Sequence, residues 1–267
     1  MADRIPRVLS IAGSDSGGGA GIQADLKAFA ACGVHGMTAI TAITAQNTVG
    51  VSAVHAVPPE MVVEQVRQVA DDIGVDAVKI GMLGDVATID AVVEALGPVG
   101  EAPVVLDPVM VAESGAHLLA EDARGALRER LLPLVTVVTP NVPEAQVLAG
   151  TDAPAQELAR RIHALGPRAV VVTGGHRNRA TDVFFDGERL EEIPGPRHPD
   201  GAAHGSGCTH SSALAAHLAR GDDPLAAARA ARAIAGRAVA NGLRDVGRGA
   251  GPVDVIGLRR FGASTGL

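Results

Sequence analysis

Aromatic residues are nearly absent from this chain of 267 residues, which has no Trp, no Tyr and four Phe. Its core must therefore be built from Ala, Val, Leu and Ile, and a flat ligand finds few rings to stack on. Proteins that hold single-stranded nucleic acid use such rings beside basic grooves, whereas this chain has a net charge of −7. These two shortages argue against a nucleic-acid partner.

Cysteine and long apolar stretches are also scarce. The two cysteines, Cys32 and Cys208, are far apart and match no zinc-ligand spacing, and two are too few for a disulfide scaffold. No segment has the roughly 20 uninterrupted apolar residues of a membrane helix, and the first apolar run is too short for a signal peptide. We therefore expect a cytoplasmic protein with no membrane partner, long enough to bury a large core.

Short Val- and Ile-rich runs alternate with Ala- and Leu-rich helical patterns along most of the chain. This alternation predicts one α/β domain over residues 1–267, with a largely parallel central sheet and helices on both faces. The expected strands are 8–13, 36–46, 76–82, 102–110, 135–141 and 168–175, followed by a hairpin over 181–193 that turns at Asp186-Gly187. The expected helices are 21–32, 58–73, 86–96, 121–133, 143–149, 154–165, 207–220 and 224–241, and residues 193–204 are expected to form a loop.

Polar clusters follow five of these strands, at positions 13–21, 46–48, 107–108, 139–141 and 173–175. Each cluster alone is explained equally well as the turn that any α/β protein needs. In parallel sheets, however, ligands bind outside the carboxyl ends of the strands, and five clusters on one rim favour a shared site.

The segment HGSGCTH at 204–210 precedes an Ala-rich helix. Glycines that turn N–H groups inward, together with the partial positive charge of a helix N-terminus, form an anion site without a lysine. Cys208 falls in the first turn of that helix, where the pKa of a thiol tends to fall, and it could accept a proton from a substrate hydroxyl. On spacing alone, a glycine-rich loop with an inert, buried cysteine explains the segment equally well.

Asn141 and Glu144 lie three residues apart at another strand-to-helix turn. Glu144 could hold Mg²⁺ through water, and Asp107 at a neighbouring strand end could share it. A helix N-cap with an acidic first turn explains the pair without any metal. Asp25 is expected on a helix as a structural hydrogen-bond partner, and Lys79, unusual inside a strand, is expected to form an ion pair near the rim.

Seven segments then occur in an order that is typical of one family. They are GSDSGGGAGIQADLKAF, TAITAQNTVGV, KIGML, LDPVMVAESGAHLL, VTPNVPEA, GGH and HGSGCTHSSALAAHLARG. Together they closely resemble the hydroxymethylpyrimidine/phosphomethylpyrimidine kinases of thiamine biosynthesis, a branch of the ribokinase-like superfamily. The resemblance extends over residues 7–253, and GIQADLK, AQNT and HGSGC are its most specific parts.

The resemblance implies a ribokinase-like domain that forms a homodimer and uses ATP and Mg²⁺. The γ-phosphoryl group of ATP would be transferred to 4-amino-5-hydroxymethyl-2-methylpyrimidine, and a second transfer would give the diphosphate. The implied acceptor-pocket residues are Gln46, which would hydrogen-bond the pyrimidine, and Gly13, Ala20, Met82 and Val109. The other implied site residues are the base Cys208, the anion hole Gly205, Ser206 and Gly207, the metal carboxylates Asp107 and Glu144, and the ATP-phosphate residues Asn141, Thr173 and Gly175.

The chain departs from the family pattern at three of these places. Thr173 stands where the family often has Lys, so that a charge partner for phosphate is missing unless Arg177 or Arg179 replaces it. Ser206 stands for Thr and keeps the hydroxyl, and His210 stands for a usually apolar residue. The glycines of the opening loop, which carries no GKS or GKT, are then interpreted as one wall of the acceptor pocket, opposite Gln46.

Three other functions remain open at this point. A pyridoxal or other vitamin B6 kinase would use the same scaffold and a similar ring, although AQNT favours the pyrimidine. A sugar kinase of the superfamily would carry Asp where Cys208 stands. A non-catalytic ligand-binding protein is supported only by Thr173, and Cys208, Asp107 and Glu144 count against it.

Overall fold

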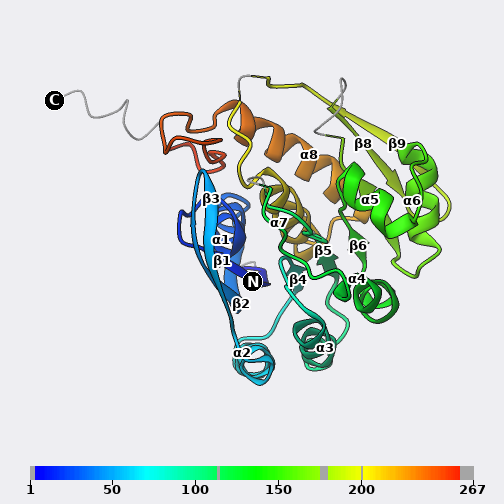
Figure 1. Ribbon diagram of the computed structural model, residues 1–267. Helices are drawn as coiled ribbons and strands as arrows, with labels where there is room; N and C mark the ends of the chain where they lie inside the picture. The colour runs from blue at the N-terminus through cyan, green and yellow to red at the C-terminus, as the bar shows by residue number, and fades with distance from the viewer. Residues whose placement is uncertain (1–3, 113–114, 175–179, 200, 259–267) are drawn as a thin grey trace.

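The computed structural model describes residues 4–112, 115–174, 180–199 and 201–258, and within them nine strands form one sheet (Figure 1). The strand order is β3-β2-β1-β4-β5-β6-β7-β8-β9. The six central strands, β2-β1-β4-β5-β6-β7 in spatial order, pair in parallel. Strand β3 at one edge, and β8 and β9 at the other, pair antiparallel. The strands are β1 (Arg7–Asp15), β2 (His35–Asn47), β3 (Gly50–Ala56), β4 (Ala77–Ile80), β5 (Val104–Leu106), β6 (Val137–Val138), β7 (Ala169–Val172), β8 (Ala180–Phe185) and β9 (Leu190–Gly195).

Helices cover both faces of this sheet, because successive residues of the central strands point to opposite sides. Val104 and Leu106 of β5 pack in one apolar cluster with α2, α3, α5 and α6, whereas Val105 packs in a second cluster with α1, α7 and α8. The helices are α1 (Gly21–Ala31), α2 (Pro59–Asp72), α3 (Val86–Ala95), α4 (Ala123–Ala126), α5 (Val142–Ala149), α6 (Ala155–His163), α7 (Ser206–Ala219) and α8 (Pro224–Ala240). The expected α/β class, with a largely parallel sheet and helices on both faces, is confirmed.

Three elements differ from the sequence-based expectation. Strand β3 was not expected, because its side chains are mostly exposed and show no apolar alternation. The helix expected over 121–133 is one α-helical turn followed by a π-helical stretch, Leu127–Leu131, and a 3₁₀ turn that contains Pro133. Proline has no N–H with which to continue the helix. Strand β9 also extends to Gly195, into the expected loop.

The polar strand ends meet at one edge of the sheet, where α7 begins (Figure 1). Helix α7 starts after Gly205, whose backbone is left-handed with φ +83°. No helix in the described part of the chain is long and apolar enough to cross a membrane.

Candidate active site

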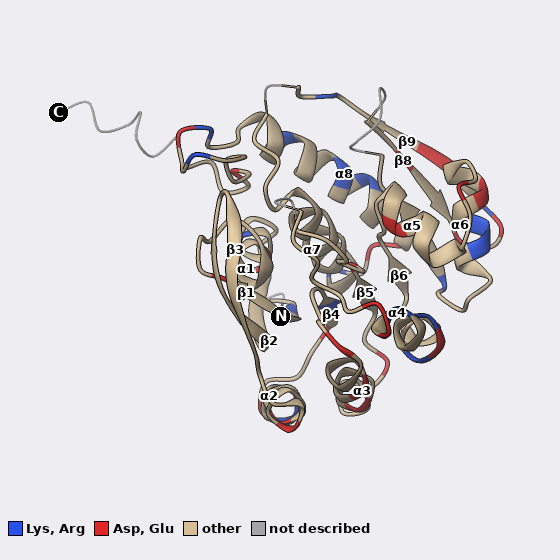
Figure 2. Ribbon diagram, in the orientation of Figure 1, with Lys and Arg blue, Asp and Glu red and all other residues tan. Residues whose placement is uncertain are grey.

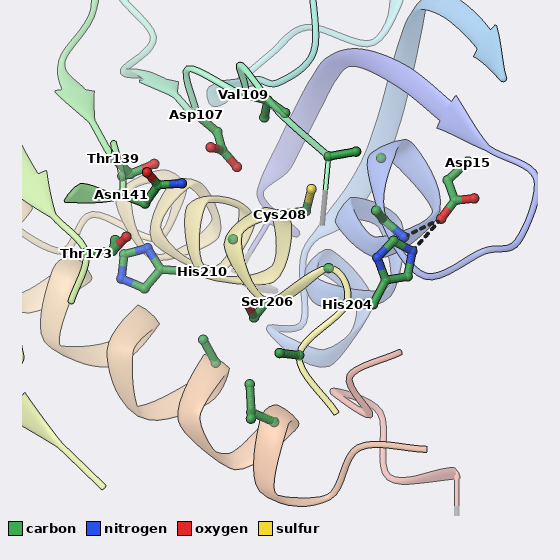
Figure 3. Close-up of a pocket in the computed structure, with 18 of the residues that line it drawn as sticks. Asp15, Asp107, Val109, Thr139, Asn141, Thr173, His204, Ser206, Cys208 and His210 are labelled. Carbon is green, nitrogen blue, oxygen red and sulfur yellow. Dashed lines mark hydrogen bonds and ion pairs between the residues drawn. The ribbon is translucent and has the colours of Figure 1, made fainter. Parts of the chain in front are cut away.

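A cavity of about 440 Å³ lies between the carboxyl ends of the parallel strands and the N-terminus of α7 (Figure 3). The predicted site residues that the structure describes all line it, although they come from segments far apart in the sequence. They are Gly13, Ala20, Gln46, Met82, Asp107, Val109, Asn141, Glu144, Thr173, Gly205, Ser206, Gly207 and Cys208. Gly175, Arg177 and Arg179 lie outside the described residues.

One end of the cavity is formed by Gly13, Met82 and Gln46. A Cβ on Gly13 would lie 3.0 Å from the Sδ atom of Met82, so glycine keeps this wall open. The backbone of Gln46 is held by Ser16, whose Oγ donates to its carbonyl at 2.7 Å and accepts from its N–H at 2.9 Å. Thr44 Oγ1 lies 3.1 Å from the carboxamide Oε1 of Gln46. Gln46 therefore presents an amide donor and acceptor at a fixed position.

The glycine loop after β1 wraps around the carboxylate of Asp15 rather than around an open phosphate site. Asp15 accepts hydrogen bonds from the N–H groups of Gly17, Gly19 and Ala20 at 2.8, 3.0 and 2.8 Å. Burial by itself would raise the pKa of Asp15, but the hydrogen bonds from His204 and the loop outweigh it and hold the pKa below its ordinary value. The loop uses its N–H groups internally, which agrees with its interpretation as a pocket wall.

The loop before α7 packs directly on this glycine loop. A Cβ on Gly19 would lie 2.2 Å from Cδ2 of the His204 ring, and a Cβ on Gly205 would lie 1.8 Å from the carbonyl oxygen of Gly19. Gly207 is different, because its nearest neighbour would be Asp107 Oδ2 at 3.7 Å. The first turn of α7 thus leaves room for a small group beside the carboxylate of Asp107. The first N–H groups of a helix have no partners within the helix and can bind such a group.

Cys208 projects into the cavity from the first turn of α7 (Figure 3). The expectation that its pKa falls is wrong for the ligand-free chain: burial raises it to about 12, while Lys79 acts in the opposite direction and Asp25 and Asp107 add to the rise. Desolvation and nearby carboxylates outweigh the favourable end of the helix. At neutral pH this thiol is protonated in the ligand-free chain.

Asp107 and Glu144 form a pair of buried carboxyl groups on the wall opposite α7. Burial raises the pKa of Asp107, although Lys79 and the hydroxyl of Ser211, which donates to Oδ2 at 3.1 Å, oppose the rise. Burial and the charge of Asp107 raise the pKa of Glu144 to about 8. The charge of Asp107 therefore destabilises the ionised form of Glu144, and a cation bound between them would relieve this effect.

Asn141 and Glu144 also form a capping box at the start of α5. Asn141 Oδ1 accepts from the N–H of Glu144, and Glu144 Oε2 accepts from the N–H of Asn141, both at 2.9 Å. Glu144 Oε1 accepts from the N–H of Met110 at 3.3 Å. The structural explanation of this pair is thus correct, and both residues still line the cavity.

Lys79 forms the expected ion pair, and its partner is Asp25. Both side chains are fully buried, with Nζ 2.9 Å from Oδ1, and Ser10 and Ser212 donate to the same carboxylate at 2.6 and 2.8 Å. Burial alone would lower the pKa of Lys79, but the charges of Asp25, Cys208 and Asp107 outweigh it and raise the pKa. Lys79 also lines the cavity, a role that the strand pattern did not indicate.

Sequence reasoning missed several residues of the cavity wall. Asp182 of β8 and Arg232 of α8 meet His210 of α7, and His204 contacts Asp15. A histidine within the Ala-rich segment that begins α7 was the only signal for the first group. Its partners lie on elements that the sequence gives no reason to bring together.

The fold and the cavity define a small-molecule kinase of the ribokinase-like class. A helix N-terminus with a thiol in its first turn and two buried carboxyl groups line one cavity, and the carboxamide of Gln46 lines it as well. Phosphoryl transfer depends mainly on such positioning and charge stabilisation.

Comparison with known proteins identifies the family. A sequence profile described as phosphomethylpyrimidine kinase matches residues 15–254. The hydroxymethylpyrimidine/phosphomethylpyrimidine kinase of Rhizobium meliloti (strain 1021) is 51% identical over 253 residues, which cover 92% of this chain and 95% of that protein. The chain belongs to the phosphomethylpyrimidine kinase family.

Two further relatives show the range of proteins similar to this chain. The thiamine biosynthesis bifunctional protein ThiED of Geobacter sulfurreducens is 48% identical over 257 residues, which cover 93% of this chain but only 52% of that protein. The crystal structure of an ADP complex of Bacillus subtilis pyridoxal kinase is similar with a TM-score of 0.87 at 38% identity, covering 96% of this chain and 99% of that chain.

Proposed function

We propose that this chain transfers the γ-phosphoryl group of ATP to 4-amino-5-hydroxymethyl-2-methylpyrimidine, and then to its monophosphate to give the diphosphate. The observation that carries the proposal is the cavity in which the N-terminus of α7 faces Asp107 beside the pocket of Gln46. Relatives named for this activity, 51% and 41% identical over most of this chain, support it.

The acceptor binds against the glycine loop, and the carboxamide of Gln46 reads the edge of the pyrimidine. An amide can donate to one ring atom and accept from the exocyclic amine, which rejects analogues that lack these groups. The hydroxymethyl group then points towards Cys208, which takes its proton as the oxygen bonds to phosphorus. For this step the thiol must first lose its own proton, and Lys79, which lowers the pKa of Cys208, favours that loss.

Asp107 and Glu144 fit a Mg²⁺ ion. Mg²⁺ is bound by one or two carboxylates, water and substrate phosphates. The pKa values of both groups are raised, so their ionised forms are poorly stabilised here and a bound cation would stabilise them. When bound, Mg²⁺ would neutralise charge on the transferred phosphate. The N–H groups of Gly207 and Cys208, in the first turn of α7, hold the oxygens of that phosphate, whereas the N–H of Ser206 donates to the carbonyl of Ala203 at 2.9 Å.

The other end of the cavity suits the nucleotide. Asn141 and Thr173 lie side by side there, paired as neighbouring strand ends. Ala235, Gly236 and Val239 of α8 add a small apolar surface on which a flat base could lie. The ADP complex of the similar pyridoxal kinase supports a nucleotide in this fold.

A vitamin B6 form is the second candidate acceptor. The solved structures similar to this chain include several named pyridoxal kinases, among them a Staphylococcus aureus protein in complex with pyridoxal at a TM-score of 0.86. Pyridoxal shares a six-membered ring with a hydroxymethyl group, so that the same cavity could accept it.

The test measures ADP release and phosphorylated product with ATP, Mg²⁺ and each alcohol in turn. We expect turnover with the pyrimidine, a second turnover with its monophosphate, and a higher kcat/KM for the pyrimidine than for pyridoxal. The Cys208→Ala protein is the control for contaminating kinases. Turnover with pyridoxal but not with the pyrimidine would reject the proposal.

We further propose that the chain forms a homodimer through the edge of the sheet at β2 and β3. Most of β3 is exposed, and Ile43, Val49 and Val54 present apolar side chains that are about half exposed. Long uncovered edge strands are usually protected by pairing. Sedimentation should give a dimer for the wild type and a monomer for Ile43→Lys, whereas a monomeric wild type would contradict the proposal.

A further inference from the structure

The nucleotide end of the cavity contains a buried cluster of three charged or titratable side chains: His210 of α7, Asp182 of β8 and Arg232 of α8. All three line the cavity, and their side chains are only 6%, 1% and 12% exposed. His210 Nε2 lies 3.3 Å and Arg232 Nε 3.8 Å from the same oxygen, Asp182 Oδ2. The carboxylate of Asp182 therefore positions both side chains on the same wall of the cavity.

Several polar atoms of this cluster lack partners within the described part of the protein, although Arg232 Nη2 donates to the carbonyl oxygen of Ala180. Both ring nitrogens of His210 and Nε of Arg232 lack a well-formed hydrogen bond there, as does Asp182 Oδ2. Asp182 Oδ1, by contrast, accepts from the N–H of Gly174 at 3.0 Å. Buried polar atoms without partners cost about 1–3 kcal/mol each, so native proteins rarely keep them without a use.

The direction of His210 separates it from the acceptor pocket. It follows Cys208 by two positions on α7, which turns its side chain by about 200° around the helix. Figure 3 shows the result, with Cys208 towards Val109 and His210 beside Thr173. An anion that meets His210 therefore comes from the side of β7, where Asn141 and Thr173 lie, and not from the acceptor.

Lysine does not supply the positive charge at this end. The chain has two lysines, Lys27 and Lys79. Lys27 Nζ donates to the carbonyl of Gly18, and Lys79 is buried against Asp25. Several arginines lie along α8 (Figure 2), and Arg232 is the one that lines the cavity. Arg197 also lines it, but from an exposed position.

We propose that His210, as an imidazolium held by Asp182, and Arg232 together bind the phosphate oxygens of the nucleotide in this chain. The proposal rests on the proposed function, because it assumes a nucleoside triphosphate at this end of the cavity. Arg232 contributes a permanent charge, since a guanidinium is not deprotonated in proteins. His210 lies two positions after Cys208, and its ring places a second hydrogen-bond donor beside Thr173.

The charges around His210 are compatible with this role. Asp182 from β8 and Arg232 from α8 are its close neighbours, and Asp107 after β5 acts on it at longer range. Burial alone would raise the pKa of Asp182, but His210, Arg232 and the N–H of Gly174 outweigh it and hold the pKa low. Asp182 therefore stays anionic at neutral pH and presents a carboxylate oxygen to the His210 ring.

The experiment measures ATP and adenosine binding by calorimetry for the wild type, His210→Leu and His217→Leu. His217 is a matched control, because it lies on the same helix but pairs with Asp222 at the surface. We expect His210→Leu to weaken ATP binding about 10-fold at pH 6 and less at pH 8, with adenosine binding unchanged. The control variant should bind both ligands like the wild type.

A second measurement on the wild type covers the case in which His210→Leu fails to fold. The NMR signals of the His210 ring, assigned by their loss in His210→Gln, should show a higher pKa with ATP than with adenosine. Three results would overturn the proposal. They are unchanged ATP binding in His210→Leu, an equal loss of adenosine binding in that variant, and a His210 ring pKa that is the same with ATP as with adenosine. A wild type that binds no ATP would instead reject the proposed function itself.

Discussion

His204 Nε2 lies 3.1 Å from Asp15 Oδ2, and this contact joins the two loops that form the active site (Figure 3). Asp15 accepts hydrogen bonds from three N–H groups of the glycine loop, while His204 immediately precedes the proposed anion hole at the start of α7. The glycine loop and the N-terminus of α7 are thereby held in one arrangement, although the two side chains are 189 positions apart in the sequence.

Asp15→Asn should lower the free energy of unfolding by about 1–3 kcal/mol, because a buried carboxylate with charged and N–H partners is replaced by a weaker acceptor. The pKa of Asp15 in the folded chain lies below its ordinary value of 3.8. Its contribution is therefore complete above that pH and is lost as the pH falls through the folded-state value. Urea unfolding should show the full difference between variant and wild type at pH 7, and a difference that shrinks steadily as the pH is lowered below 3.8.

Asp222→Asn is the control for that measurement, since it removes an Asp–His contact of 2.6 Å that is exposed to solvent. Exposed ion pairs contribute about 0–1 kcal/mol. Equal losses in the two variants would show that the buried contact has no special importance.

Gly207→Ala should separate activity from stability. A Cβ at this position meets nothing closer than Asp107 Oδ2 at 3.7 Å. The free energy of unfolding of the variant should therefore lie within about 1 kcal/mol of the wild-type value. The methyl group would nevertheless occupy the space between the helix N-terminus and the carboxylates, and we expect kcat to fall at least about 10-fold. Gly125→Ala, on α4 with open space around it, should change neither quantity. Full activity in Gly207→Ala would contradict the proposal that the transferred phosphate binds beside Gly207.

Cys208 should react slowly with alkylating reagents in the ligand-free protein. With a pKa of about 12, its thiolate is rare at pH 8, and we expect iodoacetamide labelling at least about 100-fold slower than for free cysteine. Peptide mass spectrometry distinguishes it from Cys32, whose pKa is also raised by burial. Rapid labelling of Cys208 would contradict this prediction, because it would show that the helix N-terminus lowers the pKa of the thiol more than burial raises it.

Cys208→Ala should leave pyrimidine binding nearly intact and lower turnover by about 10²–10⁴-fold, the usual range for a general base. Steady-state kinetics and calorimetry with the pyrimidine measure the two effects separately. A variant with the turnover of the wild type would exclude the thiol from the mechanism.

Gln46→Ala should weaken pyrimidine binding by about 1–3 kcal/mol, roughly 5- to 150-fold, because the ring loses its amide partner in a partly buried pocket. ATP binding should change little, since the nucleotide end lies across the cavity. Calorimetry with each ligand tests this, and equal losses for both would contradict the assignment.

Lys79→Met should destabilise the fold by about 3–5 kcal/mol, because it leaves the Asp25 carboxylate fully buried without its cation. The double variant Lys79→Met with Asp25→Asn should recover part of that loss, as the two residues form one unit. Urea unfolding of the four proteins gives the coupling energy. Additive effects of the two substitutions would show that the pair is not coupled.

The sequence by itself determined the order and type of the elements and placed the polar clusters at strand ends. Alternation of β-branched and Ala-rich segments is a local pattern, and so are a glycine turn before a helix and the capping box of Asn141 and Glu144. Strand β3 was missed for the same reason, since its register depends on pairing with β2 and not on burial of its own side chains.

Only the tertiary structure decided the electrostatics and the partners. Cys208 stands at the start of a helix, yet its pKa rises because burial outweighs the effect of Lys79 and because Asp25 of α1 and Asp107 after β5 lie near it. Asp182 and Arg232 meet His210 from two separate elements, and His204 reaches Asp15 from the far end of the chain. Such contacts depend on distance and desolvation, and these exist only once the sheet has brought its strand ends and helices together.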